Sequence, residues 1–169
     1  MSSVRVTADM HYPADPGSVF TMLTDQAFQE RKTGQISKGP WDVRVHREGD
    51  SAVIVSRRTL PPDVIPEAFR GMVGSSITVT QTEKWGPAGP DGIRNGSIDV
   101  EIGGAPVRLT GQLTLGPTAD GGCTERVEGD LKAKVPLFGG KIEKAAEPAV
   151  RAAIDAEGRI GLAWLAEHP

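Results

Sequence analysis

Three polar side chains occupy positions where the hydrophobic pattern of this chain predicts an interior. The segment SSITVTQTEKW alternates with period two, which predicts a strand that carries Gln81 and Glu83 on its apolar face. The hydrophobic residues of that face are Ile77, Val79 and Trp85. Glu157 falls within the apolar stripe of a predicted C-terminal helix. Because a buried polar group is unfavourable unless it is paired, each of the three needs a partner, a ligand or a route to solvent.

Two kinds of chemistry are open to a carboxylate in such a position. It can bind a ligand hydroxyl or amine as the polar anchor of a pocket, or it can act as a general acid or base if its pKa is shifted. For Glu157 we weigh the anchor against a side chain that reaches the rim and pairs there with an arginine. For Glu83 and Trp85 we expect the strand end to leave the core for solvent. The carboxylates form no paired constellation in the sequence, so no catalytic residue is assigned.

Motifs of the common metal, nucleotide and nucleophile sites are absent from the sequence. The histidines His11, His46 and His168 form no pair with metal-ligand spacing. There is no Walker loop, no dinucleotide fingerprint and no nucleophile elbow. The single cysteine, Cys123, has no neighbour that would activate it. We therefore predict no metal site and no cofactor.

The first half of the chain predicts a strand, two short helices and a series of strands. Alternation predicts a strand over residues 4–10, and in YPADPGSVFTMLTD Asp15 is a helix cap with Pro16 at the first helical position. Two short helices end near Gly34, and six more strand patterns joined by turns favour sequential antiparallel pairing. Residues 61–74 form a long insert with a short helix, which we interpret as a lid or binding loop.

A long amphipathic helix is predicted from about Gly140 to Glu167. At about 100° per residue, one face carries small and apolar side chains: Ile142, Ala146, Ala149, Ala153, Ile160 and Trp164. Pro148 points outward, so we expect the helix to curve around the sheet. Alanine does not reach across to a sheet, so a ligand cavity can remain in front of this helix. Small residues also permit close packing, and the pattern alone leaves both interpretations open.

Composition and charge fit one globular domain, which we place at residues 1–169. A net charge of −3 and a pI near 5.6 argue against nucleic acid as a partner. The chain has one cysteine, no signal-like N-terminus and no apolar run of the ~20 residues that span a bilayer. We therefore expect a cytoplasmic protein with no integral membrane contact. The charged runs at residues 30–32 and 57–58 are interpreted as solvated surface.

The order of these elements resembles that of the START-like superfamily, also called the birch-pollen-allergen fold. YPADPGSVFTMLTD after the first strand and VPLFGGKIEKAAEPAV entering the last helix carry the resemblance. The segment LPPDVIPEAFRGMVGSSITVTQTEKW is similar to that of an uncharacterised branch found in actinobacteria. The resemblance implies an α+β helix-grip fold, in which a curved antiparallel sheet of about seven strands wraps around the C-terminal helix. It also implies a hydrophobic-ligand cavity between sheet and helix, and it transfers no catalytic residue.

The favoured function is the binding or carriage of a small hydrophobic or amphipathic, lipid-like ligand between the sheet and the helix. We expect the following residues to contact that ligand: Phe69, Met72, Ile77, Val79, Gln81, Ile98, Val100, Leu109, Leu113, Ala146, Ala149, Ala153, Glu157 and Ile160. One alternative is a cyclase or hydratase that uses Glu157 or Glu83 as a buried acid or base. Another is a protein-interaction module that docks a partner through residues 61–74. The oligomeric state stays open.

Overall fold

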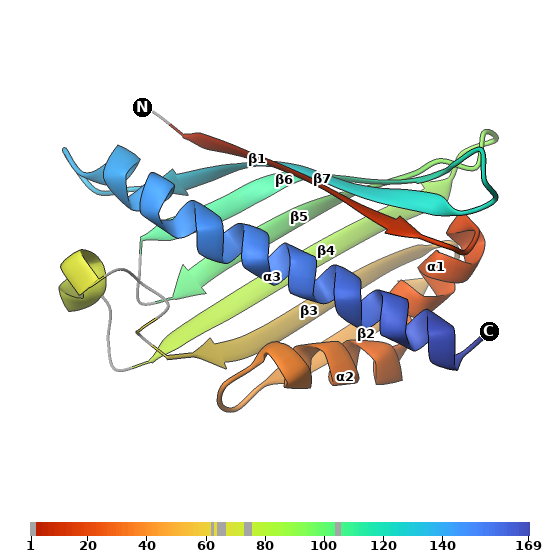
Figure 1. Ribbon diagram of the computed structural model, residues 1–169, viewed down its shortest axis with the longest axis horizontal. Coiled ribbons are helices and arrows are strands. Elements are labelled where there is room, and N and C mark those ends of the chain that lie inside the picture. The colour runs from red at the N-terminus through yellow and green to blue at the C-terminus, as the bar shows by residue number, and fades with distance from the viewer. Residues whose placement is uncertain (1–2, 62, 64–66, 73–75, 104–105) are drawn as a thin grey trace.

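A seven-stranded antiparallel sheet wraps around one long helix in the computed structural model (Figure 1). The structure describes residues 3–61, 63, 67–72, 76–103 and 106–169. The elements are β1 (Val4–Tyr12), α1 (Pro16–Leu23), α2 (Gln26–Ile36), β2 (Asp42–Glu48), β3 (Ser51–Leu60), η2 (Glu67–Met72), β4 (Ile77–Ala88), β5 (Arg94–Gly103), β6 (Val107–Pro117), β7 (Cys123–Ala133) and α3 (Gly139–Glu167). This is the helix-grip architecture that the sequence predicts.

The strand order is β1-β7-β6-β5-β4-β3-β2, so every hairpin pairs sequential strands and the first strand closes the sheet beside the last. The period-two pattern decides which face each strand buries, because successive side chains alternate. Two glycines face each other between β6 and β7, where Gly111 lies opposite Gly129. A Cβ atom at Gly111 would lie 2.2 Å from the carbonyl oxygen of Glu128, so this pairing requires glycine.

The two short helices begin at aspartate caps. Asp15 accepts hydrogen bonds from the backbone N–H of Ser18 at 3.2 Å and from its hydroxyl at 2.6 Å, which confirms the predicted start of α1. Asp25 caps α2 in the same way by accepting from the backbone N–H of Ala27 at 2.8 Å. These caps satisfy backbone donors that the first turn of a helix leaves unpaired.

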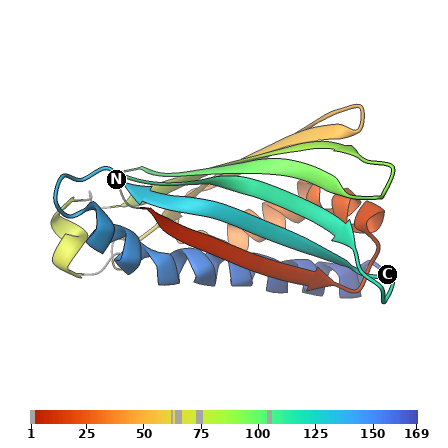
Figure 2. The ribbon, with the colours of Figure 1, turned by 90° about the horizontal axis from the view of Figure 1, so that it is seen from above.

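Helix α3 lies across the concave face of the sheet, and the sheet curves over it (Figures 1 and 2). Pro148 is exposed as predicted, but the buried face of α3 is rotated away from the predicted one, and Ala149 is exposed. The most buried positions of the helix are Ile142, Glu143, Ile154, Gly158 and Gly161. Gly158 and Gly161 set this rotation because they permit an approach that a side chain would block.

The closest approach is at Gly161, where an added Cβ would lie 2.9 Å from Cε1 of Tyr12. At Gly158 an added Cβ would lie 3.1 Å from Cγ of Met10. Close packing therefore accounts for the glycines of this helix, in agreement with the second of the two interpretations left open by the sequence.

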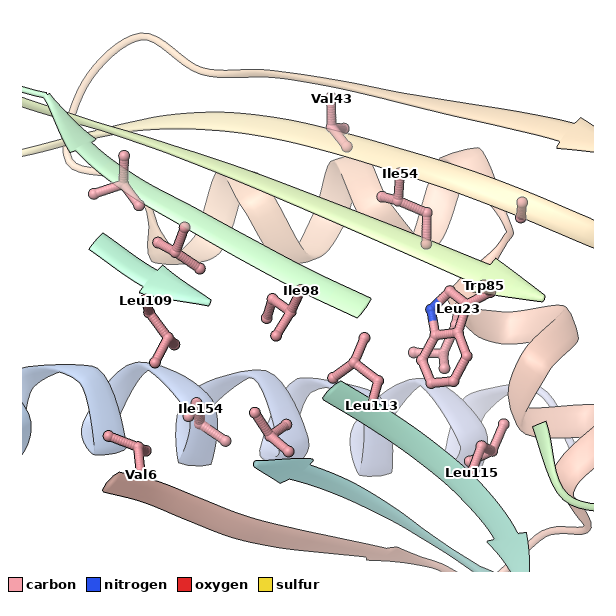
Figure 3. Close-up of a cluster of buried hydrophobic side chains, with 14 of the residues drawn as sticks. Val6, Leu23, Val43, Ile54, Trp85, Ile98, Leu109, Leu113, Leu115 and Ile154 are labelled. Atoms are coloured by element: carbon pink, nitrogen blue, oxygen red, sulfur yellow. The ribbon is translucent and has the colours of Figure 1, made fainter. Parts of the chain in front are cut away.

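The apolar core lies between the concave sheet face and α3. In Figure 3 the side chains of Ile98, Leu109 and Leu113 point from the sheet toward the helix that carries Ile154. Helix α2 covers β2 and β3, whereas α1 lies against β6 and β7. Phe20 of α1 packs edge-on against Trp85 of β4 at a centroid distance of 6.3 Å. None of the helices described here is long and apolar enough to cross a membrane.

The insert after β3 contains the short helix η2, which lies at the same end of the molecule as the first turns of α3 (Figures 1 and 2). Its predicted boundaries Pro66 and Gly74 lie outside the described residues, as do the side chains of Phe69 and Met72. Their proposed role as a lid, a ligand contact or a docking surface stays a prediction.

Candidate functional site

Four ionisable side chains from four different elements meet inside the fold. They are Lys32 of α2, Glu83 of β4, Glu125 of β7 and Glu157 of α3, and we call them the interior acidic cluster. Lys32, Glu83 and Glu125 are at most 6% exposed, and the side chain of Glu157 is 14% exposed. The four surround an enclosed space of about 20 Å³, whose other walls are Met10, Tyr12, Leu23, Phe28, Ile98, Val127 and Ile154.

Local periodicity brings each of these side chains inward. Lys32 follows Phe28 by one helical turn, so both point from α2 into the interior. Glu125 alternates in phase with Val127 along β7, as Glu83 does with its apolar neighbours along β4. The curvature of the sheet then brings these strands together against α3.

Ion pairing and amide hydrogen bonds connect part of the cluster. Lys32 Nζ lies 3.4 Å from Glu157 Oε1, which joins α2 to α3. The side-chain amide of Gln81 donates to Glu83 Oε1 at 3.1 Å and to Glu157 Oε1 at 3.4 Å. Arg58, itself buried, donates to Gln81 Oε1 at 3.3 Å. Gln81 therefore bridges a strand carboxylate and the helix carboxylate.

Two buried polar atoms at this site make no hydrogen bond of standard geometry with a described residue, although the Trp85 indole lies close enough to Glu83 to oppose the rise of its pKa. They are Glu83 Oε2 and Trp85 Nε1. Leaving such a group unpaired in the interior costs about 1 to 3 kcal/mol, and more when the group is charged. Glu83 also lines the enclosed space, so an acceptor with unused capacity faces the interior.

Burial and mutual repulsion shift the ionisation of the cluster. Burial raises the pKa of Glu125 to about 8, and the negative charge of Glu83 adds to this rise while Lys32 opposes it. Burial also raises the pKa of Glu83 above its ordinary value, again opposed by Lys32. Burial alone would lower the pKa of Lys32, but the carboxylates of Glu157, Glu83 and Glu125 together raise it. At neutral pH the site therefore combines a charged ammonium group with a carboxylic acid, Glu125, that is mostly protonated.

Tyr12 lines the same enclosed space as the interior acidic cluster. Burial and the neighbouring Glu125 raise its pKa, so its hydroxyl stays protonated. The hydroxyl lies 3.8 Å from the sulfur of Met10, the only hydrogen-bond acceptor found for it among the residues described. Within the described part of the chain, no three His, Cys, Asp or Glu side chains form a group that could hold a metal ion.

Most of the residues predicted to contact a ligand lie in the interior. The predicted strand residues are all buried on the concave face: Ile77, Val79, Gln81, Ile98, Val100, Leu109 and Leu113. On α3, Ala146, Ala153 and Ile160 are half-buried, and Glu157 lies in the cluster rather than at an arginine-paired rim. Ala149 points to solvent, so its assignment to the ligand-facing side was wrong. Ligand contact at the buried positions stays a prediction.

Two expectations about charge were wrong. Glu83 and Trp85 do not leave the core: both are buried, Phe20 of α1 packs on Trp85, and the exposed end of β4 lies beyond them, at Pro87 and Ala88. Lys32 and Arg58 are buried although their runs were interpreted as solvated surface. Sequence analysis also did not select Glu125. Its phase with Val127, and the one-turn spacing of Phe28 and Lys32, were the available signals.

The enclosed space is far smaller than the cavity expected from the resemblance. A volume of about 20 Å³ is of the order of one water molecule, so an organic ligand must displace α3 or its neighbours. A larger hollow of about 440 Å³ lies on the outer face of β4–β7. It is open, and most of its charged residues already form ion pairs, as Arg5 does with Glu128 at 3.1 Å and Asp99 does with the neighbouring Arg108 at 2.5 Å. Unused hydrogen-bonding capacity therefore favours the interior as the candidate site.

Comparison with solved structures confirms the START-like fold. Human STARD10 matches over 97% of this chain and 66% of its own, with a TM-score of 0.59 and 11% identity. The Zhui aromatase/cyclase from Streptomyces sp. R1128 matches over 95% and 90%, with a TM-score of 0.55 and 12% identity. The lipid transfer and protein localization domain of human StarD13 matches over 94% and 76%, with a TM-score of 0.51 and 13% identity. These identities show a shared fold.

Sequence relatives occur in mycobacteria. An uncharacterized protein of Mycobacterium tuberculosis is 28% identical over 108 residues, which cover 63% of this chain and 59% of the relative, so the match spans well under two thirds of that protein. A Mycobacterium bovis protein matches to the same extent. The model of a protein family described as Protein of unknown function (DUF2505) matches residues 7–165, and the chain therefore belongs to that family.

Proposed function

We propose that this protein binds a small amphipathic molecule between the sheet and α3, with the polar group of the ligand held at the interior acidic cluster. The observation that carries the proposal is the unpaired, buried Oε2 atom of Glu83 beside the enclosed space. A ligand donor at this point would satisfy an acceptor that the protein leaves unpaired.

The cluster favours a ligand group that donates hydrogen bonds. Three carboxyl groups and one ammonium group make the interior rich in acceptors. A hydroxyl or an amine fits this surplus, whereas a carboxylate would meet like charge. The aliphatic part of such a ligand would lie against Val100, Leu109 and Leu113, which line the concave face beyond the cluster.

Opening of the interior is part of the proposal, because the enclosed space is too small for an organic ligand. Weak binding follows from this requirement. Burying about ten methylene groups contributes about 8 kcal/mol at ~0.8 kcal/mol each, and association alone costs at least ~4 kcal/mol. The remainder is at most about 4 kcal/mol, which corresponds to a dissociation constant of about 1 mM at best and suits a carrier. The lipid-transfer domain of StarD13, which shares the fold, supports the same ligand class.

Native mass spectrometry of freshly purified protein tests this proposal, followed by extraction with organic solvent and identification of what is released. Because a millimolar complex is largely lost during purification, we expect bound ligand, a small molecule with a hydroxyl or amine group and an aliphatic portion, once the protein is incubated with an excess of it. A Glu83→Gln variant should retain less of it than the parent. Protein that stays free of ligand after purification and after incubation with a panel of long-chain alcohols and amines would contradict the proposal.

A second candidate function is acid–base catalysis, favoured by one specific observation. Glu125 is a buried carboxylic acid with a pKa of about 8, close to Glu83 and Lys32. A group with such a pKa can donate and accept a proton near neutral pH. An aromatase/cyclase that shares the fold supports this candidate. Loss of substrate turnover in Glu125→Gln with unchanged ligand affinity would favour the enzyme over the carrier.

A further inference from the structure

A short apolar tip protrudes between β7 and α3. Leu137 is 97% exposed and Phe138 is 51% exposed, more than any other large hydrophobic residue in the described part of the chain. Leu137 also has a φ of 70°, the only left-handed backbone conformation at a non-glycine residue among those described. Glycine would adopt this conformation without strain, so the chain keeps a bulky apolar side chain here at a cost to folding.

The tip is held in place by the elements on both sides of it. The backbone N–H of Lys134 donates to the carbonyl of Pro106 at 2.9 Å, and that of Ala133 donates to the carboxylate of Glu143 at 2.9 Å. The Phe138 carbonyl accepts from the Ile142 backbone N–H at 3.1 Å, which joins the tip to the first turn of α3. The fixed backbone therefore presents the two apolar side chains to solvent.

Lysines flank the tip on both sides in the sequence, although the whole chain has a net charge of −3. Four lysines lie within six residues of it: Lys132, Lys134, Lys141 and Lys144. The last three are exposed, and none of the four forms an ion pair with a described residue. Glu143, the only acidic residue in the same stretch, is buried. An exposed apolar tip with lysines on both sides of it in the sequence is complementary to an anionic lipid surface.

We propose that the tip docks the protein onto anionic lipid surfaces, with Leu137 and Phe138 inserted between the lipids and the lysines against their phosphates. A protein partner would need a shaped apolar surface opposite the tip, whereas a lipid surface accepts two protruding side chains without one. The contact is peripheral and strengthened by negative lipid charge. It is independent of the interior site, because Glu157 lies 18 residues from Gly139 along α3, about 27 Å at 1.5 Å per residue.

Vesicle co-sedimentation tests the proposal. The full chain is mixed with vesicles of pure phosphatidylcholine or of phosphatidylcholine with about one third phosphatidylglycerol. We expect binding to the anionic vesicles alone, weakening as salt is added. The double variant Leu137→Gly/Phe138→Ser should bind about tenfold or more weakly, since it removes most of the inserted apolar surface. Lys141→Glu/Lys144→Glu should lose binding as well.

Control variants separate the tip from general surface effects. Leu162→Ser changes an exposed leucine on α3, outside the tip. Lys38→Glu changes an exposed lysine just after the end of α2. Both variants should bind vesicles like the parent. Thermal melting should show the Leu137→Gly/Phe138→Ser protein folded, because glycine suits the backbone at position 137. Unchanged vesicle binding by this variant overturns the proposal. The proposal is also overturned if the parent protein binds neither type of vesicle. This includes the case in which size-exclusion chromatography shows that the protein self-associates through the tip instead.

Discussion

Lys32 of α2 and Glu157 of α3 form a buried ion pair, with Nζ 3.4 Å from Oε1 and side chains 8% and 14% exposed. The pair links the short helix α2 directly to the long helix α3. Among the described residues, Lys32 is also the only cation that lines the enclosed space, which it shares with three carboxyl groups. It therefore balances charge for the whole cluster and not for Glu157 alone.

Replacing Lys32 with methionine should be strongly destabilising. The substitution keeps an aliphatic side chain of similar length but leaves the cluster without its cation, and breaking a buried pair in this way costs about 3 to 5 kcal/mol. Urea denaturation at pH 7 measures the loss, with Lys84→Met on the outer face of β4 as the matched control. The loss should shrink toward pH 5, where the carboxylates can take up protons. Equal stability of the two variants would show that Lys32 is not balancing buried charge.

The stability of the parent should fall as pH rises from about 5 to 8. The folded-state pKa of Glu125 is raised from 4.5 to about 8, so the folded protein binds more protons than the unfolded chain across this window. Stability contributed by the protonated group is complete below the unfolded pKa and is lost as pH rises through the folded one. The slope for one such group is at most about 1.4 kcal/mol per pH unit.

Glu125→Gln should remove most of that slope, because glutamine keeps the volume and cannot ionise. Urea denaturation midpoints at several pH values between 5 and 8 provide the comparison, and Glu48→Gln, an exposed position on β2, is the control. We expect the control to follow the parent. A Glu125→Gln protein with the parent's pH dependence would mean that Glu125 is ionised in the fold across this range.

Gly161→Ala should destabilise the protein although alanine is the better helix former. An added Cβ would lie 2.9 Å from Cε1 of Tyr12 and 3.2 Å from the methyl group of Met22, which would push α3 off the sheet. Ala163→Gly, on an exposed position of the same helix, measures the helix-propensity difference by itself, about 1 kcal/mol. Thermal unfolding of both variants is compared. If Gly161→Ala gains as much stability as Ala163→Gly loses, α3 does not pack against Tyr12 and Met22 as closely as the structure shows.

Local patterns predicted the strands, the aspartate cap of α1 and the long helix because each of these depends on neighbouring residues. Sequential antiparallel pairing followed, since short turns leave little choice of partner. The buried face of α3 was not predictable from hydrophobicity, because Gly158 and Gly161 determine it through closeness of approach. The hydrophobic pattern counts apolar side chains, and glycine has no side chain to count.

The interior acidic cluster could be predicted only in part for a related reason. Gln81, Glu83 and Glu157 broke an apolar pattern and were recognised, whereas Lys32 lies in a charged run that resembles surface. Its burial depends on the docking of α2 against α3, which brings together residues 125 positions apart in sequence. No pattern within one element contains that contact.

The most direct test of the account is an NMR titration of ¹⁵N-labelled protein with decylamine, and with decanoate as a probe of equal chain length and opposite charge. We expect decylamine to shift the backbone amides of Glu83, Glu125, Glu157 and Ile98 in a saturable manner, and decanoate to shift them far less. In Glu83→Gln the affinity for decylamine should fall, because the unpaired acceptor has lost its charge. Shifts confined to the outer sheet face or to the Leu137–Phe138 tip, or equal binding of both probes by parent and variant, would contradict an interior site for a hydrogen-bond-donating ligand.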